Sequence, residues 1–109
     1  MNTLSELFKV LSDDTRLRII NLLAKQDLCV CELVDILDLS QPKISKHIAR
    51  LRSINLVNTK RNEQYIYYSL DRSNFEYMNI INTVLQTKNT KLLEDIRNLE
   101  KVETFVCSK

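Results

Sequence analysis

The chain has 109 residues and a formal net charge of +2, and it has no apolar run of the length that a membrane span needs. This length predicts a single domain, and so short a chain often completes its core by pairing with a second copy. Residues 1–10 lack the apolar core of a signal peptide, so we expect a cytoplasmic protein without a membrane partner. Three cysteines in a reducing compartment favour ligand or reactive thiols over a disulfide framework.

Positive charge is concentrated in the middle of the chain. Residues 1–40 carry four basic and seven acidic side chains (−3), and residues 41–72 carry seven basic and two acidic ones (+5), whereas residues 73–109 carry five of each. A phosphate-contacting surface would therefore come from residues 41–72, although a merely solvated basic face would give the same pattern.

Two short helices are predicted near the N-terminus. Thr3 and Glu6 have the spacing of a capping box, and a helix over residues 3–11 follows. Ser12 is the expected N-cap of a second helix that runs to about Lys25. The apolar faces of the two helices contain Leu4, Leu7, Phe8 and Leu11, and then Leu17, Ile20, Leu23 and Ala24.

A helix-turn-helix is predicted over residues 31–53. Its first helix covers residues 31–37, with Cys29 at the N-cap position and Glu32 at the spacing of a capping box. After a tight turn, Ser40 caps the second helix, which is the recognition helix that enters the major groove in this motif. The buried stripe of that helix is Ile44, Ile48 and Leu51.

A β-hairpin wing over residues 57–70 follows the recognition helix. Residues 57–61 and 65–70 alternate and are rich in Tyr, Val, Ile and Thr, which is typical of strands. The chain has no glycine, so we expect Asn55 to end the recognition helix and Asn62 to form the hairpin turn. The strand alternation indicates that three tyrosines pack the wing on the core and do not stack on single-stranded nucleic acid: Tyr65, Tyr67 and Tyr68.

The C-terminal third is predicted to be helical over residues 74–100. A capping box starts at Ser73, and a weak boundary near residues 88–90 divides the segment. The fold class is thus mainly α with a small β-hairpin, a single winged helix-turn-helix domain over residues 1–109. The inward residues are Met78, Ile81, Val84 and Leu85, followed by Leu92, Leu93, Ile96 and Leu99.

The outward positions of the recognition helix are candidate DNA contacts. Glutamine can pair with adenine, lysine with guanine and serine with either base, whereas arginines and lysines further along are placed for phosphates. His47 is the only histidine of the chain, so it is a poor metal ligand, and a polar groove-facing or helix-surface role is favoured. The base-facing candidates are Gln41, Lys43, Ser45, Lys46, His47 and Arg50, and the phosphate candidates are Arg50, Arg52, Lys60 and Arg61.

Cys29 and Cys31 lie one residue apart at the start of the first helix of the helix-turn-helix. Helical residues two apart point about 200° away from each other, at roughly 100° per residue, so a regular helix would keep the two sulfurs from one ion. The N-cap position of Cys29 relieves this geometry, but we expect ligation by both sulfurs to distort the first turn and misplace the recognition helix. The helix dipole is expected to lower the pKa of both thiols, although small cysteines that simply fill space are the alternative.

The cysteine spacing favours some ligands over others. Zinc usually takes four ligands, with cysteine pairs spaced by two or more residues. A three-coordinate thiophilic metalloid fits a dithiol plus one further thiol, for which Cys107 is the candidate. A thiol enzyme is disfavoured because the motif is not Cys-x-x-Cys and no glycine-rich phosphate loop is present.

Three segments carry a family resemblance: Asp27-Leu28-Cys29-Val30-Cys31-Glu32-Leu33, Leu39-Ser40-Gln41-Pro42 and Ser45-Lys46-His47-Ile48. They resemble the ArsR/SmtB family of metal-sensing repressors, and the first segment resembles its arsenic-responsive branch. The resemblance covers about residues 4–70. It implies a homodimer formed by helices 3–11 and 74–100, which binds double-stranded operator DNA and is released by As(III) or Sb(III) at Cys29 and Cys31. No permanent cofactor is implied.

Differences from other branches narrow the effector. Some arsenic-responsive members carry a third cysteine where this chain has Val34, so the third ligand is Cys107, an exogenous thiol or none. Cadmium sensors add cysteines before the position of Cys29, and zinc sensors use histidines in the segment that corresponds to residues 73–109, which here has none. A Cd(II)-sensing repressor and a thiol-redox switch of the same fold remain the alternatives.

Overall fold

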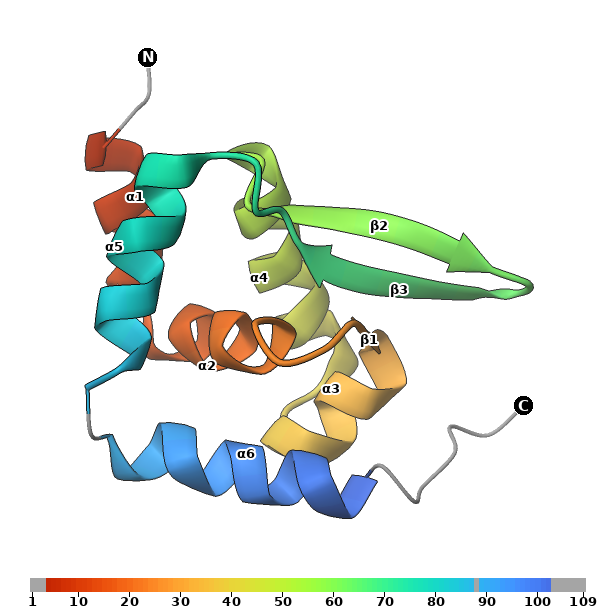
Figure 1. The fold of residues 1–109 in the computed structure, drawn as a ribbon. Coiled ribbons are helices and arrows are strands. Elements are labelled where there is room, and N and C mark those ends of the chain that lie inside the picture. Colours follow the sequence, from red (N-terminus) through yellow and green to blue (C-terminus); the bar gives the residue numbers. More distant parts are fainter. Residues whose placement is uncertain (1–3, 88, 103–109) are drawn as a thin grey trace.

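The computed structural model describes residues 4–87 and 89–102, and these residues form six helices and three strands (Figure 1). The fold is mainly helical with a small antiparallel sheet, as the sequence predicted. None of the described helices is long and apolar enough to span a membrane. The elements are α1 (Leu4–Leu11), α2 (Asp14–Leu23), β1 (Leu28–Cys29), α3 (Val30–Leu37), α4 (Gln41–Ser53), β2 (Val57–Asn62), β3 (Tyr65–Leu70), α5 (Phe75–Leu85) and α6 (Thr90–Val102).

Helices α3 and α4 form the helix-turn-helix, and α2 packs against α4 from below (Figure 1). Asp38 begins the tight turn between α3 and α4 in the left-handed conformation, at φ 58°. The Ser40 side chain accepts the Lys43 backbone N–H at 3.3 Å, which confirms the predicted cap of α4. Asn55 has φ 63° directly after α4, as expected of the residue that replaces a glycine there. The predicted stripe of α4 is buried in the core: Ile44, Ile48 and Leu51.

The wing is the β2–β3 hairpin, but its turn lies one residue later than predicted. Asn62 still belongs to β2 and pairs with Tyr65, so the turn consists of Glu63 and Gln64 alone. The left-handed residue is Glu63, at φ 59°, and the expectation for Asn62 was wrong. A two-residue hairpin turn needs positive φ at its first central position, and here the strand register decides which residue occupies it.

A short strand that the sequence did not reveal joins the sheet. Leu28 pairs with Tyr68 and Cys29 with Tyr67, so β1 extends the sheet in the order β1-β3-β2. Two residues are too few for a strand pattern to be visible in the sequence. The pairing fixes the backbone of Cys29 to the wing.

Two helices start one residue later than expected. The Asp13 carboxylate accepts the backbone N–H of Arg16, the third residue of α2, whereas the hydroxyl of Ser12 donates to the Lys9 carbonyl at the end of α1. Asn74 caps α5 in the same way, and Ser73 lies outside the helix. Asp and Asn are as good N-cap residues as Ser. When two such residues are adjacent, the side-chain type does not decide which one is the N-cap, and only the backbone conformation does.

The predicted C-terminal segment forms two helices with different neighbours. Helix α6 turns back and packs on α2 and α3, while α1 and α5 meet at the opposite end of the molecule (Figure 1). Leu92 and Leu99 of α6 are buried, but Leu93 is 53% exposed. Leu4 and Phe8 of α1 are also half exposed, although the sequence placed them on the buried face.

Candidate DNA-binding face and dithiol site

The polar side of α4 forms one exposed face. With its apolar stripe buried against α2 and α3, four of the six predicted base-reading side chains are exposed: Gln41, Lys43, Ser45 and Lys46. Arg50 is 38% exposed, because its Nη2 atom donates to Glu6 Oε1 of α1 at 3.2 Å. A helix with a polar outward face and a nearby wing is the arrangement that enters the major groove in proteins of this fold.

His47 does not lie on that face, and the expectation that it points outward was wrong. Its side chain is only 13% exposed and faces α2, where Nδ1 lies 3.3 Å from Nη1 of Arg16 and 4.0 Å from Oδ1 of Asp13. The helical period is correct, but His47 lies beside the buried stripe and the neighbouring helix covers it. A base contact by His47 would require this side chain to leave α2.

Two of the four basic residues predicted for phosphates line a groove between α4 and the wing. The groove has a volume of about 660 Å³, and Arg52 and Lys60 line its two sides. Lys60 also forms an exposed ion pair with Asp27 at 3.2 Å, and Arg61 is exposed on β2. Arg52 and Lys60 thus lie on the two sides of this groove, and their contact with DNA phosphates stays a prediction, as does that of Arg61.

The sulfurs of Cys29 and Cys31 lie 3.2 Å apart. Cys29 is the N-cap of α3 with an extended backbone (φ −90°, ψ 170°), and this conformation turns its side chain toward that of Cys31. The Cys29 N–H donates to Glu32 Oε1 at 3.0 Å, which completes the predicted capping box. The two sulfurs therefore lie side by side next to a regular first turn of α3 when no ion is bound, and the distortion expected on ligation stays a prediction.

Burial raises the pKa of the Cys29 thiol above its ordinary value, and the carboxylate of Glu32 raises it further. The backbone N–H groups at the start of α3 act in the opposite direction but do not prevail. The expectation that the helix dipole lowers the pKa of this thiol was therefore wrong. Cys29 is 4% exposed, and the cost of burying a thiolate exceeds the stabilisation that one short helix end provides.

The cysteine pair lies in a groove that also reaches the recognition helix. This groove has a volume of about 520 Å³, and Gln41, the first residue of α4, lines it together with Val34 and residues of the wing. Among the residues that the structure describes, no group of three His, Cys, Asp or Glu side chains is placed to hold one metal ion. Cys107, the proposed third ligand, lies outside the described residues.

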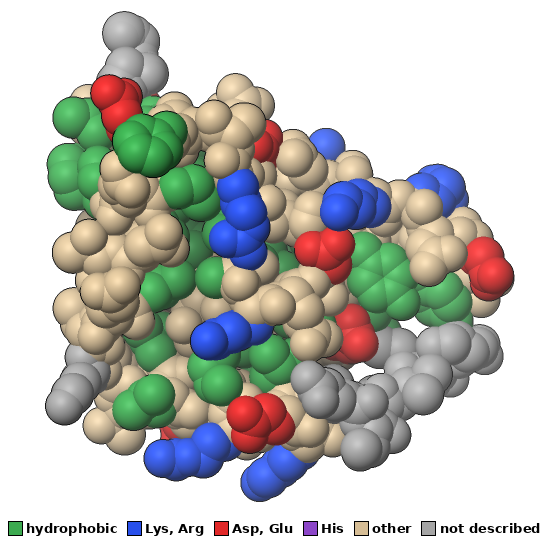
Figure 2. Space-filling model, in the orientation of Figure 1, with side chains coloured by type: hydrophobic (Ala, Val, Ile, Leu, Met, Phe, Trp, Pro, Cys, Tyr) green, Lys and Arg blue, Asp and Glu red, His purple; other side chains and the backbone are tan. Residues whose placement is uncertain are grey.

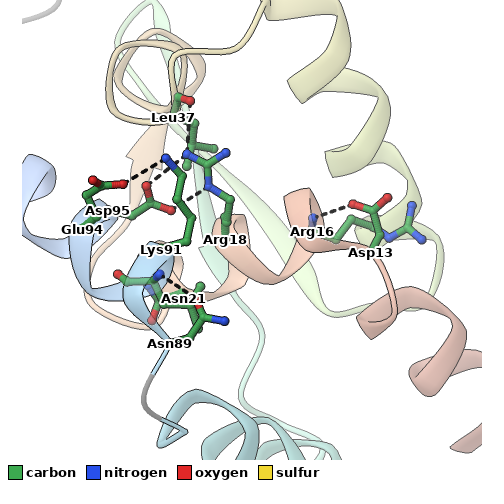
Figure 3. A network of polar contacts seen from close by, with 10 residues as sticks. Asp13, Arg16, Arg18, Asn21, Leu37, Asn89, Lys91, Glu94 and Asp95 are labelled. Carbon is green, nitrogen blue, oxygen red and sulfur yellow. Dashed lines mark hydrogen bonds and ion pairs between the residues drawn. The ribbon is translucent and has the colours of Figure 1, made fainter.

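A buried polar network between α2, α3 and α6 was missed at the sequence level (Figure 3). Arg18 Nε donates to Asp95 Oδ2 at 2.8 Å, and Arg18 Nη2 donates to the Leu37 carbonyl at the end of α3 at 3.2 Å. Asn21 Nδ2 donates to the Leu92 carbonyl at 3.1 Å. The only sequence signal was a pair of charged residues on otherwise apolar helix faces. Arg18 thereby links α6 to α3, the first helix of the helix-turn-helix.

A packed helix-turn-helix with a polar recognition helix and a two-stranded wing defines a winged-helix DNA-binding regulator. The chain belongs to the ArsR family: residues 13–59 match the family described as "Bacterial regulatory protein, arsR family". It is 37% identical to the arsenical resistance operon repressor of Staphylococcus aureus over 95 residues, which cover 81% of this chain and 91% of that protein.

Two further relatives support this assignment. The arsenic resistance transcriptional regulator ArsR1 of Pseudomonas putida is 52% identical over 64 residues, which cover 58% of this chain but only 50% of that protein. The structure of HlyU from Vibrio cholerae is similar with a TM-score of 0.66 and 36% identity, covering 73% of this chain and 85% of that one. The named relatives are regulators and not enzymes, as the sequence predicted.

Proposed function

We propose that the protein is a homodimeric repressor that binds double-stranded operator DNA through α4 and the wing and leaves it when As(III) or Sb(III) binds Cys29 and Cys31. The observation that carries this proposal is the contact of the two sulfurs, 3.2 Å apart, in a groove shared with the first residue of α4. The relatives from Staphylococcus and Pseudomonas are named for arsenic resistance, which supports arsenic as the effector.

The sulfur separation suits a small pyramidal ion. Two bonds of about 2.3 Å, a typical metal–thiolate length, span about 3.3 Å when they meet at about 90°. Arsenous acid, As(OH)₃, would exchange two hydroxyl groups for the sulfurs of Cys29 and Cys31 and release two waters. The third position would keep a hydroxyl group or take a further thiol, such as that of Cys107.

The raised pKa of Cys29 favours arsenous acid over Cd(II) and over an oxidant. The exchange of hydroxyl groups for thiols consumes the thiol protons as water and needs no ionised thiol at equilibrium. Binding of Cd(II) must release the protons, so a raised pKa weakens it. Peroxide reacts with the thiolate, whose fraction burial and Glu32 reduce.

Two contacts connect the cysteine pair to the DNA-binding face. The backbone of Cys29 pairs with Tyr67 of the wing strand β3, and α3 packs directly on α4. An ion held by both sulfurs fixes the first turn of α3 to β1. Any shift of this turn would reach the wing and the N-terminal end of α4, where Gln41 lies. Release of DNA then follows from a changed distance between the wing and the recognition helix.

Reduced protein bound to DNA from directly upstream of its gene tests this function in a gel-shift titration. We expect arsenite to release the DNA at a concentration far below that needed for Cd(II) or for peroxide. Arsenate serves as the matched control, because pentavalent arsenic does not bind thiols without being reduced. Retention of the DNA at saturating arsenite would overturn the proposed effector, and absence of salt-sensitive binding would overturn the DNA-binding role.

The proposed dimer uses the end of the molecule where α1 and α5 meet. Hydrophobic side chains gather there (Figure 2), and three large ones remain exposed in the single chain: Leu4 at 50%, Phe8 at 54% and Phe75 at 74%. Such a cluster on so small a protein is typical of a protein–protein interface. A two-fold axis at this end would leave the recognition helices facing away from the interface.

Replacing Phe8 by aspartate is expected to convert the dimer into monomers, because a charge in an apolar interface is left unpaired. Leu93→Asp on α6 is the matched control, since Leu93 is equally exposed at 53% but lies at the other end of the molecule. Sedimentation equilibrium measures both variants. A monomeric Leu93→Asp variant together with a dimeric Phe8→Asp variant would assign the interface to α6 instead.

A further inference from the structure

One side chain connects the recognition helix to the corner between α1 and α2. Arg16 of α2 donates from Nε to the Val10 carbonyl at 2.8 Å and from Nη2 to the Lys9 carbonyl at 3.4 Å, so its guanidinium covers the C-terminal end of α1. Its remaining nitrogen, Nη1, lies 3.3 Å from Nδ1 of His47 on α4. Arg16 therefore contacts α1 and α4 from α2 at the same time.

This contact fixes the protonation state of His47. A guanidinium has five N–H donors and no acceptor, so a hydrogen bond between Arg16 and His47 requires Nδ1 of the imidazole to accept. An accepting Nδ1 carries no proton, and the ring proton is then on Nε2. His47 is therefore neutral whenever the contact exists.

The charges around His47 favour the neutral ring. Arg16 of α2 opposes protonation, and Asp13, the N-cap of α2, supports it. Lys43 and Lys46 of α4 itself also oppose it. From α1, the carbonyl groups of Lys9 and Val10 accept hydrogen bonds from Arg16. Asp13 Oδ1 is 4.0 Å from Nδ1, beyond hydrogen-bond reach, and accepts the Arg16 backbone N–H at 3.0 Å (Figure 3). Burial, followed by these positive neighbours, lowers the pKa of His47 despite Asp13.

We propose, on the basis of the DNA binding proposed above, that Arg16 is a positioning residue that holds α4 through neutral His47, and that protonation of His47 weakens operator binding. A protonated Nδ1 becomes a donor that faces the Arg16 donor, and a second positive charge then lies beside the guanidinium. Both effects separate α4 from the corner of α1 and α2.

The sign of the pH dependence distinguishes this role from the one expected from the sequence. A groove-facing histidine would gain a positive charge near phosphates as the pH falls, and DNA affinity would increase. A positioning histidine at the Arg16 contact would lose its hydrogen bond, and DNA affinity would decrease. The loss sets in as the pH falls through the pKa of His47 in the folded protein, which lies below the ordinary histidine pKa of about 6.5.

Nitrogen NMR of the whole protein tests the contact without DNA. His47 is the only histidine in the chain, so histidine labelled with ¹⁵N gives one ring spectrum. We expect an unprotonated Nδ1, a protonated Nε2, and a titration midpoint below that of a histidine peptide. An Nδ1–H tautomer, or a midpoint at or above the peptide value, would overturn the proposal.

DNA affinity between pH ~7.5 and ~5.5 tests the coupling. We expect wild-type affinity to fall as His47 becomes protonated, by roughly threefold to tenfold in total, the size of one net hydrogen bond. His47→Asn keeps an acceptor near the Nδ1 position but does not titrate, so its pH profile should be flatter. Arg16→Lys keeps the charge but cannot span all three acceptors, and should bind more weakly at pH ~7.5; Arg97→Lys, on exposed α6 surface, is its matched control.

The outcomes separate this inference from the proposed function. An affinity that increases as the pH falls, or a His47→Asn profile identical to that of the wild type, would overturn the positioning role even if arsenite releases the DNA. A protein with the expected tautomer that binds no DNA at any pH would overturn the proposed function and, with it, the coupling to DNA binding.

Discussion

Replacing Asp95 by alanine is expected to lower the free energy of unfolding by about 3–5 kcal/mol. Asp95 is fully buried on α6 and accepts from Nε and Nη2 of Arg18 at 2.8 and 3.1 Å (Figure 3). The hydrogen bond to Asp95 raises the pKa of Arg18, but the ordinary pKa of a guanidinium is already so high that Arg18 remains charged when Asp95 is removed. Without Asp95, the Arg18 guanidinium is a mostly buried charge with no carboxylate partner. This unpaired charge destabilises the folded state and accounts for most of the expected loss in the free energy of unfolding.

Two further variants show whether the stability lost in Asp95→Ala comes from the unpaired charge or from lost packing. Glu94→Ala removes the neighbouring carboxylate, which forms an exposed pair with Lys91 at 3.1 Å, and should leave the stability nearly unchanged. Arg18→Met combined with Asp95→Leu removes both buried charges and should recover much of the stability. Urea denaturation followed by circular dichroism measures all three. An Asp95→Ala variant as stable as Glu94→Ala would show that α6 does not depend on this pair.

The Arg18 network also extends to the helix-turn-helix. Its third hydrogen bond ends on the Leu37 carbonyl, at the last residue of α3 and directly before the turn that leads to α4. Loss of Asp95 therefore frees both α6 and a guanidinium that helps to hold the end of α3. We expect the Asp95→Ala variant to bind DNA more weakly even under conditions in which it remains folded.

Features with a local physical cause were predictable from the sequence. The stripe of α4 follows from helical periodicity, and the cap at Ser40 follows from the need of the first N–H groups for an acceptor. Asn55 was predictable because a chain without glycine must use its next best residue where φ is positive. Each of these depends on residues within about two helical turns of one another.

Features that depend on distant partners were not predictable in this way. Arg18 and Asp95 are 77 positions apart, and neither carries a local pattern that identifies the other. The orientation of His47 was misjudged for the same reason: its helical position is lateral, and only the packing of α2 against α4 decides that it is covered. Tertiary contacts overrode local position in both cases.

The cysteine pair has one property that was predictable from local sequence and one that depends on distant residues. The N-cap position of Cys29 was correctly read from its spacing to Glu32. The pKa of Cys29 was predicted in the wrong direction. Its side chain is buried in β1, and this strand exists only because it pairs with β3. Burial is a tertiary property, and it reverses the effect that the helix end alone would have had.

Replacing Cys29 by serine is expected to raise the arsenite concentration needed for half-release of DNA by at least about 100-fold, while DNA affinity without arsenite is retained. Loss of a residue that only supports a metal ligand typically costs about 10–100-fold in affinity, and loss of one of two sulfurs should reach or exceed the upper limit. Cys31→Ser should have an effect of the same size, because the two sulfurs, 3.2 Å apart, bind the ion together. A gel-shift titration with reduced protein measures both variants.

The folded state should tolerate these substitutions, so that a lost response reports on the ligand site itself. Serine is among the preferred N-cap residues, and Cys29→Ser places it at the N-cap of α3, with the Glu32 half of the capping box unchanged. Cys31 is exposed, and its replacement leaves no cavity. Cys107→Ser is the third variant: a comparable loss would assign Cys107 as the third ligand, and an unchanged response would leave a two-sulfur site. Wild-type release in both Cys29→Ser and Cys31→Ser would exclude the dithiol as the sensor and leave the DNA-binding face intact as a separate conclusion.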